Sequence, residues 1–549
     1  MDFEEDTWAR VCCVIFAQLR AIRVLLQLRQ RGETVAMAAA RECTSPSFWL
    51  AASLAGCVVS FITPSVEALV ATAGATLIFN CIGAPDEVDN GGCWEWCMSA
   101  FLSIAPLASV FSGGTLIDGL LQILPYFKLS FTFVYAAAGF AKLNTDFLNY
   151  RTSSNTIFLI KLLASPPFVG PPGIPSSILS DAMWRLIFRA ALVLLAVTEL
   201  AIPIFFFWMH MPCIGAAINW IFHLFVGAAA YNFSCSGTGA LPFVLPMDSA
   251  VHGYGFMTVS LPSRSIALCV TCALALSQWP KPGAPDAYNR VHGLCSMRTG
   301  SFEKNSIHAT WLGWAIVLAV GIRRQCICIA TGAIDDEEEA VATFASTLQN
   351  PIVDAVGLFI STVFLITCLA PYLGIKTHST FSMFSNLRCE GGISNHILFR
   401  AWMQPFGFLA DMVTVTATNH ERIRHFMRGV GGIDTMGSMK SLVVRESLDC
   451  TIYGQLKRGR GIAGSDETNT VFPYSIPYIQ LRSLIAESTQ EDFFVEYEHK
   501  KATHRFVLHN GNVVHGGDAR LRARLPMLLR PWIFCRALQP NDNTGLCYH

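Results

Sequence analysis

The sequence predicts an all-α polytopic membrane domain of about eight or nine transmembrane helices, followed by a smaller, polar α+β domain. Hydrophobic residues make up 52% of the 549 positions and charged residues only 14%, which is more apolar surface than a soluble core of this length would bury. The charges are also unevenly spread: 18 lie among the 239 residues 42–280, against 32 among the 154 residues 396–549. The second density is normal for a water-exposed surface, so a domain boundary lies between the two regions.

The composition also limits the partners. The formal net charge is +0, and no basic stripe of the kind that binds phosphate backbones is present, so we expect no nucleic-acid partner. The 19 cysteines are scattered, and many of them lie in apolar runs, where cysteine packs as a small hydrophobe. Cys269 and Cys272 have no second pair at zinc-finger spacing, so we expect no metal site there.

Residues 1–46 are predicted to form a basic amphipathic arm. Six arginines, from Arg10 to Arg41, are interleaved with Val, Ile, Leu and Phe, a pattern typical of a helix that lies on a membrane surface. The positive-inside rule places this arm and the N-terminus on the cytoplasmic side. The identity of the membrane does not follow from the residues.

Residues 47–376 form the predicted transmembrane domain. Apolar runs of about 18–25 residues follow one another there, and a run of that length can cross a hydrocarbon core at about 1.5 Å per residue. They lie at 47–64, 66–83, 95–112, 119–143, 185–209, 212–233, 263–279, 309–332 and 351–374. The lipid bilayer is therefore the first partner that we expect.

Residues 377–400 form a predicted polar loop at the membrane interface. Its central part, 385–396, is rich in hydrogen-bonding and charged side chains, and Gly391 with Gly392 permits a tight turn. We therefore predict a structured loop over the mouth of the membrane domain, and the alternative is a simple polar linker. The candidate ligand-binding residues here are Arg388, Glu390, Asn395 and His396.

Residues 401–549 are predicted to form the polar C-terminal domain, with β-hairpins. The clearest hairpin is at 505–514, because Asn510-Gly511 supplies the positive φ angles of a type I′ turn between two β-prone runs. His420 and His425 are five positions apart, whereas two zinc ligands on one helix face need a separation of four. We therefore assign them no metal.

Lys142 is the first catalytic candidate, because charged residues at membrane depth are costly and mark functional sites. Helical spacing places Tyr135, Gly139, Lys142 and Asp146 on one face, and an amine removed from water there can act as a base in its neutral form. Tyr135 is a candidate for ligand binding on the same face. In the alternative interpretation, Lys142 extends from a helix end to the interface and pairs with Asp146.

Glu199 and His223 are the other catalytic candidates. Glu199 lies deep in an apolar run, where a carboxylate needs a partner on another helix or a polar cavity. His223 lies one turn after Asn219, which makes Asn219 a further ligand-binding candidate. The alternative for all three residues is a hydrogen bond between helices without chemistry.

The stretch YAAAGFAKLNTDF at 135–147 resembles the membrane domain shared by vitamin K-dependent gamma-carboxylase and the bacterial horizontally transferred transmembrane (HTTM) proteins. ELAIP at 199–203, FHLF at 222–225 and NFS at 232–234 follow in the order that those families show, and MFSNLRCEGGISNH at 383–396 is similar to a motif of HTTM-like proteins. Together the matches cover roughly residues 50–400, and no single motif among them is highly specific.

The resemblance implies chemistry on a reduced quinone. In the carboxylase, a lysine in the matching context deprotonates vitamin K hydroquinone, which reacts with oxygen to give a base that removes a glutamate γ-proton, and carbon dioxide then adds. Lys142 stands in that lysine's place, and the implied cofactor is a vitamin K-like hydroquinone. The carboxylase also uses a histidine upstream of its lysine, and here this chain departs from the family, because its first histidine is His210.

Two functions follow from the sequence. The first is a membrane protein that binds a lipophilic, quinone-like molecule between its helices and acts on it as a carboxylase-like or epoxidase-like enzyme, with Lys142 as base. The second is a non-catalytic membrane protein, a transporter or a scaffold, whose C-terminal domain binds a partner. The consequence of replacing Lys142 separates the two.

Overall fold

The computed structural model describes residues 34–149, 181–208, 212–227, 350–424 and 473–522 with short gaps, together with scattered residues between 10 and 28 and positions 153, 155 and 535. The chain divides into two compact units. The first unit comprises Met1–Ala136 and Thr198–Ile366, and the second comprises Ala137–Val197 and Thr367–His549.

Four described helices are long and apolar enough to cross a membrane, and they support the class of a multi-pass α-helical membrane protein. Each coincides with a predicted crossing. They are α5 (Asn90–Ser112), α6 (Leu116–Ala141), α8 (Asp181–Pro203) and α17 (Pro351–Leu373).

The remaining five predicted crossings are not confirmed. Three of them correspond to shorter apolar helices of 17, 17 and 16 residues, namely α3 (Pro46–Ile62), α4 (Val66–Ile82) and α9 (Pro212–Gly227). A straight crossing needs about 20 residues. The predicted crossings at 263–279 and 309–332 lie outside the described residues.

In the first unit, α3 packs on α4 and α4 packs on α5. The contact between α3 and α4 is close and polar in places. Gly56 lies directly against Thr72, and the hydroxyl groups of Ser53 and Thr76 are 3.0 Å apart. Small residues let two helix backbones approach, and hydroxyl pairs link helices in an apolar environment.

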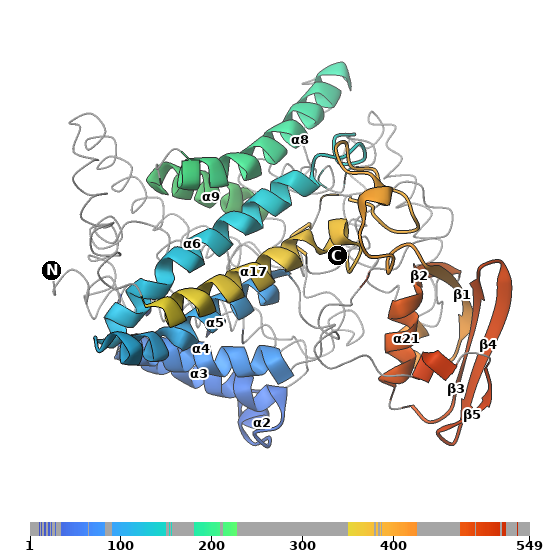
Figure 1. The fold of residues 1–549 in the computed structure, drawn as a ribbon, viewed down its shortest axis with the longest axis horizontal. Coiled ribbons are helices and arrows are strands. Elements are labelled where there is room, and N and C mark those ends of the chain that lie inside the picture. Colours follow the sequence, from blue (N-terminus) through green and yellow to red (C-terminus); the bar gives the residue numbers. More distant parts are fainter. Residues whose placement is uncertain are drawn as a thin grey trace. The chain divides into compact units, whose positions relative to one another are not determined.

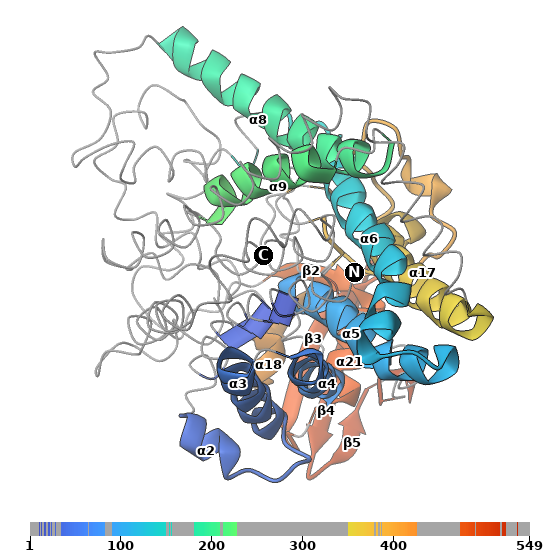
Figure 2. The same ribbon diagram turned by 90° about the vertical axis from the view of Figure 1, so that its left-hand side faces the viewer.

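The helices α6 and α17 run parallel and lie side by side (Figure 1, Figure 2). The Tyr126 hydroxyl donates to Asp354 Oδ1 at 2.7 Å, and one turn later the Ser130 hydroxyl donates to Ser361 Oγ at 3.2 Å. Gly357 leaves room for the Tyr126 ring, because a Cβ there would collide with it. The polar pairs therefore fix the register of two largely apolar helices.

The described part of the N-terminal arm is helical and packs into the first unit through one face. Ala17 and Ala21 pack with Cys57 of α3. The arginines of this arm were expected at a membrane surface, but Arg20 is buried and its Nη1 lies 2.7 Å from Glu95 Oε2 in α5. The physical reason is the carboxylate of Glu95, which supplies the counter-charge that a buried guanidinium requires.

The second unit contains an antiparallel five-stranded sheet, which confirms a C-terminal region with β-structure. The strand order is β2-β1-β3-β4-β5. The strands are β1 (Met412–Thr418), β2 (Tyr474–Pro477), β3 (Phe493–His499), β4 (Ala502–His509) and β5 (Asn512–His515). The helices near it are α18 (Glu421–Arg424), α21 (Tyr478–Ala486) and the 3₁₀ turn η5 (Ala519–Arg522).

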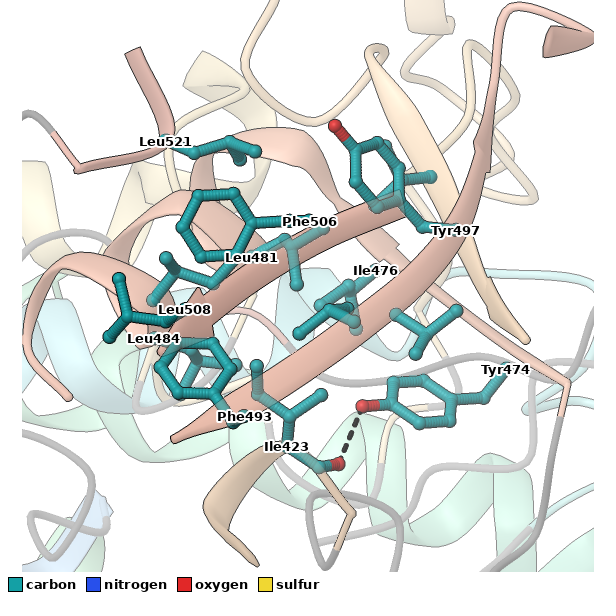
Figure 3. Packing of buried hydrophobic residues seen from close by; sticks show 14 residues of the cluster. Ile423, Tyr474, Ile476, Leu481, Leu484, Phe493, Tyr497, Phe506, Leu508 and Leu521 are labelled. Carbon is teal, nitrogen blue, oxygen red and sulfur yellow. Dashed lines mark hydrogen bonds between the residues drawn. The ribbon is translucent and has the colours of Figure 1, made fainter. Parts of the chain in front are cut away.

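One face of the sheet carries the core of this region (Figure 3). Alternate residues of the strands, such as Val413, Val495 and Phe506, are buried together with Leu481 of α21. This is the period of two expected for a sheet with one covered face. The hydroxyl of buried Tyr474 donates to the carbonyl of Ile423 at 2.6 Å and so ties α18 to β2.

The predicted hairpin at 505–514 is confirmed. β4 and β5 pair antiparallel, with His509 opposite Asn512, so Asn510 and Gly511 form a two-residue turn. Their φ angles are 49° and 71°, which is the pair of positive angles that a type I′ turn requires.

Candidate functional site

The first unit brings together Tyr135, Glu199, Asn219 and His223, here called the intramembrane polar cluster. The Tyr135 hydroxyl in α6 and His223 Nε2 in α9 are 2.6 Å apart. The two side chains are 2% and 0% exposed. A hydrogen bond that short, away from water, is stronger than the same bond at a surface.

Aromatic rings surround this pair. The Phe131 ring lies 4.9 Å from that of Tyr135, and the Phe206 ring lies 5.3 Å from that of Phe131. Phe206 belongs to η2 (Ile204–Trp208), a π-helical turn directly after α8. Such turns are rare and recur at functional sites. The cluster is therefore a small polar spot inside an apolar, aromatic environment.

Asn219 and Glu199 complete the cluster. The amide of Asn219 lies beside the Tyr135 hydroxyl, but among the described residues neither its nitrogen nor its oxygen has a hydrogen-bond partner. Glu199 is 5% exposed and interacts electrostatically with Tyr135. Four of the predicted site residues thus lie in one neighbourhood, although their positions span 88 residues of the chain.

Lys142 belongs to the second unit, whereas Glu199 and His223 belong to the first. Its side chain is 2% exposed, and its Nζ lies 5.8 Å from the centre of the Phe147 ring. A lysine that extends to the interface keeps its amine in water, so this burial does not fit that alternative. The contacts of Lys142 place it inside the second unit, directly after the last residue of α6.

Asn144, two residues further on, organises the chain after α6. Its Oδ1 accepts hydrogen bonds from the backbone of Asp146 and Phe147, at 3.1 and 2.8 Å. Its Nδ2 donates to the carbonyls of Ala141 and Ser385, at 2.8 and 2.5 Å. The side chain is 0% exposed. It therefore fixes both the end of α6 and the start of the polar loop at 385–396.

Asn395 joins the other end of the polar loop to the same place. Its Nδ2 donates to Asp146 Oδ2 at 2.7 Å, and its Oδ1 accepts from the backbone of Arg388 at 2.8 Å. The loop reverses direction at Gly391 and Gly392, whose φ angles of 69° and 74° strongly favour glycine. These bonds describe a structured loop rather than a polar linker.

His396 is held in a single tautomer. Its Nδ1 accepts from the backbone N–H groups of Leu398 and Phe399, at 3.1 and 3.0 Å, so the proton must lie on Nε2, which donates to the carbonyl of Phe140 at 2.9 Å. Burial lowers the pKa of His396 below its ordinary value. The folded loop thus requires a neutral imidazole.

Arg388 and Glu390 have described contacts that serve the loop itself. Arg388 contributes its backbone N–H to Asn395. Glu390 is 0% exposed, and its Oε2 accepts from the backbone of Cys389 at 2.9 Å. Among the described residues, no group of three or more His, Cys, Asp or Glu side chains could hold a metal ion.

Three further polar residues were not singled out from the sequence. Asn144 could have been found as a polar residue next to a helix end, and Glu95 as a charge inside a predicted crossing. Lys128 lies at the centre of α6, where a charge is costly. A charged residue within a candidate span is the signal by which the sequence can identify Lys128.

The chain matches no family model, no curated protein and no solved structure. The resemblance to the carboxylase and HTTM families is therefore a prediction from the sequence motifs alone. Function is therefore inferred from the intramembrane polar cluster and from the polar loop at 385–396.

Proposed function

We propose that this protein is a multi-pass membrane protein that binds a lipophilic molecule of the quinone or hydroquinone class at Tyr135, Asn219 and His223. One observation carries the proposal, namely the 2.6 Å bond between the Tyr135 hydroxyl and His223 Nε2 inside apolar helices. Buried polar groups at membrane depth are costly and mark ligand or ion sites.

The chemistry of the pair suits this class of ligand. A quinone carbonyl accepts a hydrogen bond, whereas a hydroquinone hydroxyl can donate one. Tyrosine and neutral histidine can each act as donor or acceptor. The pair can therefore form a hydrogen bond with both the oxidised and the reduced form of the ligand. The Asn219 amide, beside the Tyr135 hydroxyl, adds one donor group and one acceptor group.

The surroundings suit the rest of such a molecule. Ligand sites are mostly apolar, with a few polar groups that fix orientation. The Phe131 ring lies beside Tyr135 and the Phe206 ring lies beside Phe131, and flat aromatic rings pack well on a flat quinone ring.

The test is binding of decylubiquinone and its reduced form to the full chain in lipid nanodiscs, measured by calorimetry. Tyr135→Phe removes only the hydroxyl, and we expect it to weaken binding about tenfold, the equivalent of one hydrogen bond of about 1.4 kcal/mol. The matched control is Tyr126→Phe, which removes an interhelical hydroxyl from the same helix. It should leave the affinity unchanged.

Two results would contradict the proposal. The first is that neither probe binds the wild-type protein. The second is that Tyr135→Phe and Tyr126→Phe have the same affinity for the probes. In either case the Tyr135–His223 pair is a helix-to-helix hydrogen bond, and the protein falls into the non-catalytic class of transporters or scaffolds.

From the resemblance we also propose, separately from the binding site in the first unit, that Lys142 takes the proton of a hydroquinone hydroxyl. Lys142→Ala should then abolish the oxidation or epoxidation of decylubiquinol by dioxygen in reconstituted protein, while decylubiquinol still binds. Lys142→Arg keeps the positive charge but provides no base, so it should be equally inactive. Activity retained in either variant excludes Lys142 as the base without affecting the binding proposal.

A further inference from the structure

Residues 393–408, here called the collar, expose an unusual amount of apolar surface. Trp402 is 82% exposed and Leu398 is 63% exposed. The rings of Phe406 and Phe408 stack with their centres 6.2 Å apart and are both exposed. The other large exposed apolar side chains of the collar are Ile393, Ile397 and Met403. Clustered apolar exposure of this kind marks an interaction surface.

Hydrogen bonds fix the collar to the end of α17. The backbone N–H of Phe406 donates to the carbonyl of Leu373, the last residue of that helix, at 3.1 Å. The side chain of Gln404 donates to the carbonyl of Pro371 at 2.9 Å. Gly374 lies against the Phe406 carbonyl and has a φ angle of 75°, so its position has no room for a larger residue.

The collar is also fixed to the end of α6. The backbone N–H of Ile397 donates to the carbonyl of Leu143 at 2.9 Å, and His396 just before it donates to Phe140. Both helices are candidate membrane spans. The exposed apolar side chains are therefore attached where two candidate spans end.

The position of these helix ends identifies the surroundings of the collar. With its 23 residues, α17 extends about 34 Å at about 1.5 Å per residue, close to the roughly 30 Å of a hydrocarbon core. Its last carbonyl then lies near the boundary between acyl chains and headgroups. Tryptophan is the residue most typical of that boundary.

The charges of this segment also indicate a membrane surface. Residues 391–410 contain no aspartate or glutamate, and their one arginine, Arg400, is exposed. An apolar segment that carries a cation and no anion suits the headgroup region of a membrane with anionic lipids.

We propose that the collar is an interfacial membrane anchor. Trp402, Leu398 and the Phe406–Phe408 stack insert among the upper acyl chains, and Arg400 binds lipid phosphate. The anchor holds the polar loop and the end of α6 at a fixed depth. This inference rests on the membrane assignment and is independent of the quinone ligand.

The test places a photo-crosslinking side chain in the full-length protein in vesicles of phosphatidylcholine and phosphatidylglycerol. In Trp402→p-benzoylphenylalanine, illumination should attach lipid to the protein, as detected by intact-protein mass spectrometry. The matched control is Val514→p-benzoylphenylalanine, because Val514 is 66% exposed on β5, the edge strand of the sheet, and does not belong to a candidate span. It should give no lipid adduct.

Three outcomes would contradict the anchor proposal. They are a crosslink from position 402 to a second copy of the chain, the absence of a lipid adduct at position 402, and equal lipid adducts at positions 402 and 514. Flotation of the wild-type protein with the vesicles tests the membrane assignment separately. A second measurement uses the fluorescence of Trp402, obtained as the difference between the wild-type protein and Trp402→Phe. Lipids with brominated acyl chains should quench this fluorescence. If the fluorescence of Trp402 is not quenched, its side chain lies outside the acyl-chain region.

Discussion

His396 Nε2 donates a hydrogen bond to the carbonyl oxygen of Phe140 at 2.9 Å and so joins residues 256 positions apart. The same ring accepts two backbone N–H groups at Nδ1. One imidazole therefore satisfies three backbone groups and closes the polar loop onto the end of α6. Protonation at Nδ1 would remove both acceptor contacts.

We expect the stability of the second unit to fall at acidic pH because of His396. Its folded-state pKa is lowered by burial, so below about pH 6.5 the unfolded chain binds a proton that the folded chain does not. The stabilisation is complete above that pH and is lost as the pH falls through the folded pKa. Thermal unfolding in detergent between pH 5 and 8 measures this loss.

The control for that measurement is His396→Asn, which can still accept a backbone hydrogen bond but does not titrate. It should be less stable at pH 8 and have a flatter pH profile than wild type. The other histidines are unchanged in this variant, so the difference between the two profiles isolates His396. Parallel profiles would contradict the assignment.

Asn144→Asp tests the hydrogen bonds around the end of α6. The substitution keeps the size and the acceptor for Asp146 and Phe147, but it places a carboxylate oxygen against the carbonyls of Ala141 and Ser385. We expect a loss of about 3 kcal/mol or more in the free energy of unfolding, as for a buried group without its partner. Asn144→Ala removes all four bonds and should cost no more than the aspartate. If the aspartate variant is as stable as wild type, the donor contacts are not formed.

The Arg20–Glu95 ion pair predicts a non-additive response in the first unit. Glu95→Gln leaves a buried guanidinium without its counter-charge and should cost about 3–5 kcal/mol. The double variant Arg20→Met with Glu95→Leu removes both charges and should recover most of that loss. Chemical unfolding of the single and double variants measures the coupling. Additive losses would exclude the pair.

Gly511→Ala tests the hairpin turn. The φ of Gly511 is 71°, and an alanine there should destabilise the hairpin by about 1 kcal/mol. Faster hydrogen exchange of the amides of β4 and β5 would report this change. Gly407→Ala is the matched control, because its φ is not positive and a Cβ there would meet nothing within 4 Å; it should leave exchange unchanged.

The features that the sequence predicts correctly are local ones. Four spans follow from the hydropathy of continuous segments, and the hairpin follows from the conformational needs of Asn510 and Gly511. In each case the residues that decide the structure are neighbours in the chain. Physical rules for helix length and turn geometry are then sufficient.

The pairings over long distances could not be predicted in this way. Arg20 was assigned to a membrane surface because its partner, Glu95, lies 75 positions away. Tyr135 and His223 were each identified as candidates, but no local pattern specifies that they meet. The apolar side chains of the collar fall in a region that the sequence predicts to be a polar loop and the start of the C-terminal domain, because hydropathy alone does not tell which side chains a loop exposes.

The parallel course of α6 and α17 has an electrostatic consequence. Their peptide dipoles point the same way, and each helix C-terminus carries about half a negative elementary charge, so the two ends together present about one. Ala141 and Tyr372 hold these ends in one packed cluster. Lys142 follows α6 directly and Lys376 lies three residues after α17, and they are 2% and 4% exposed. The fold therefore places two lysine side chains just beyond the paired helix C-termini, where a positive charge is favoured.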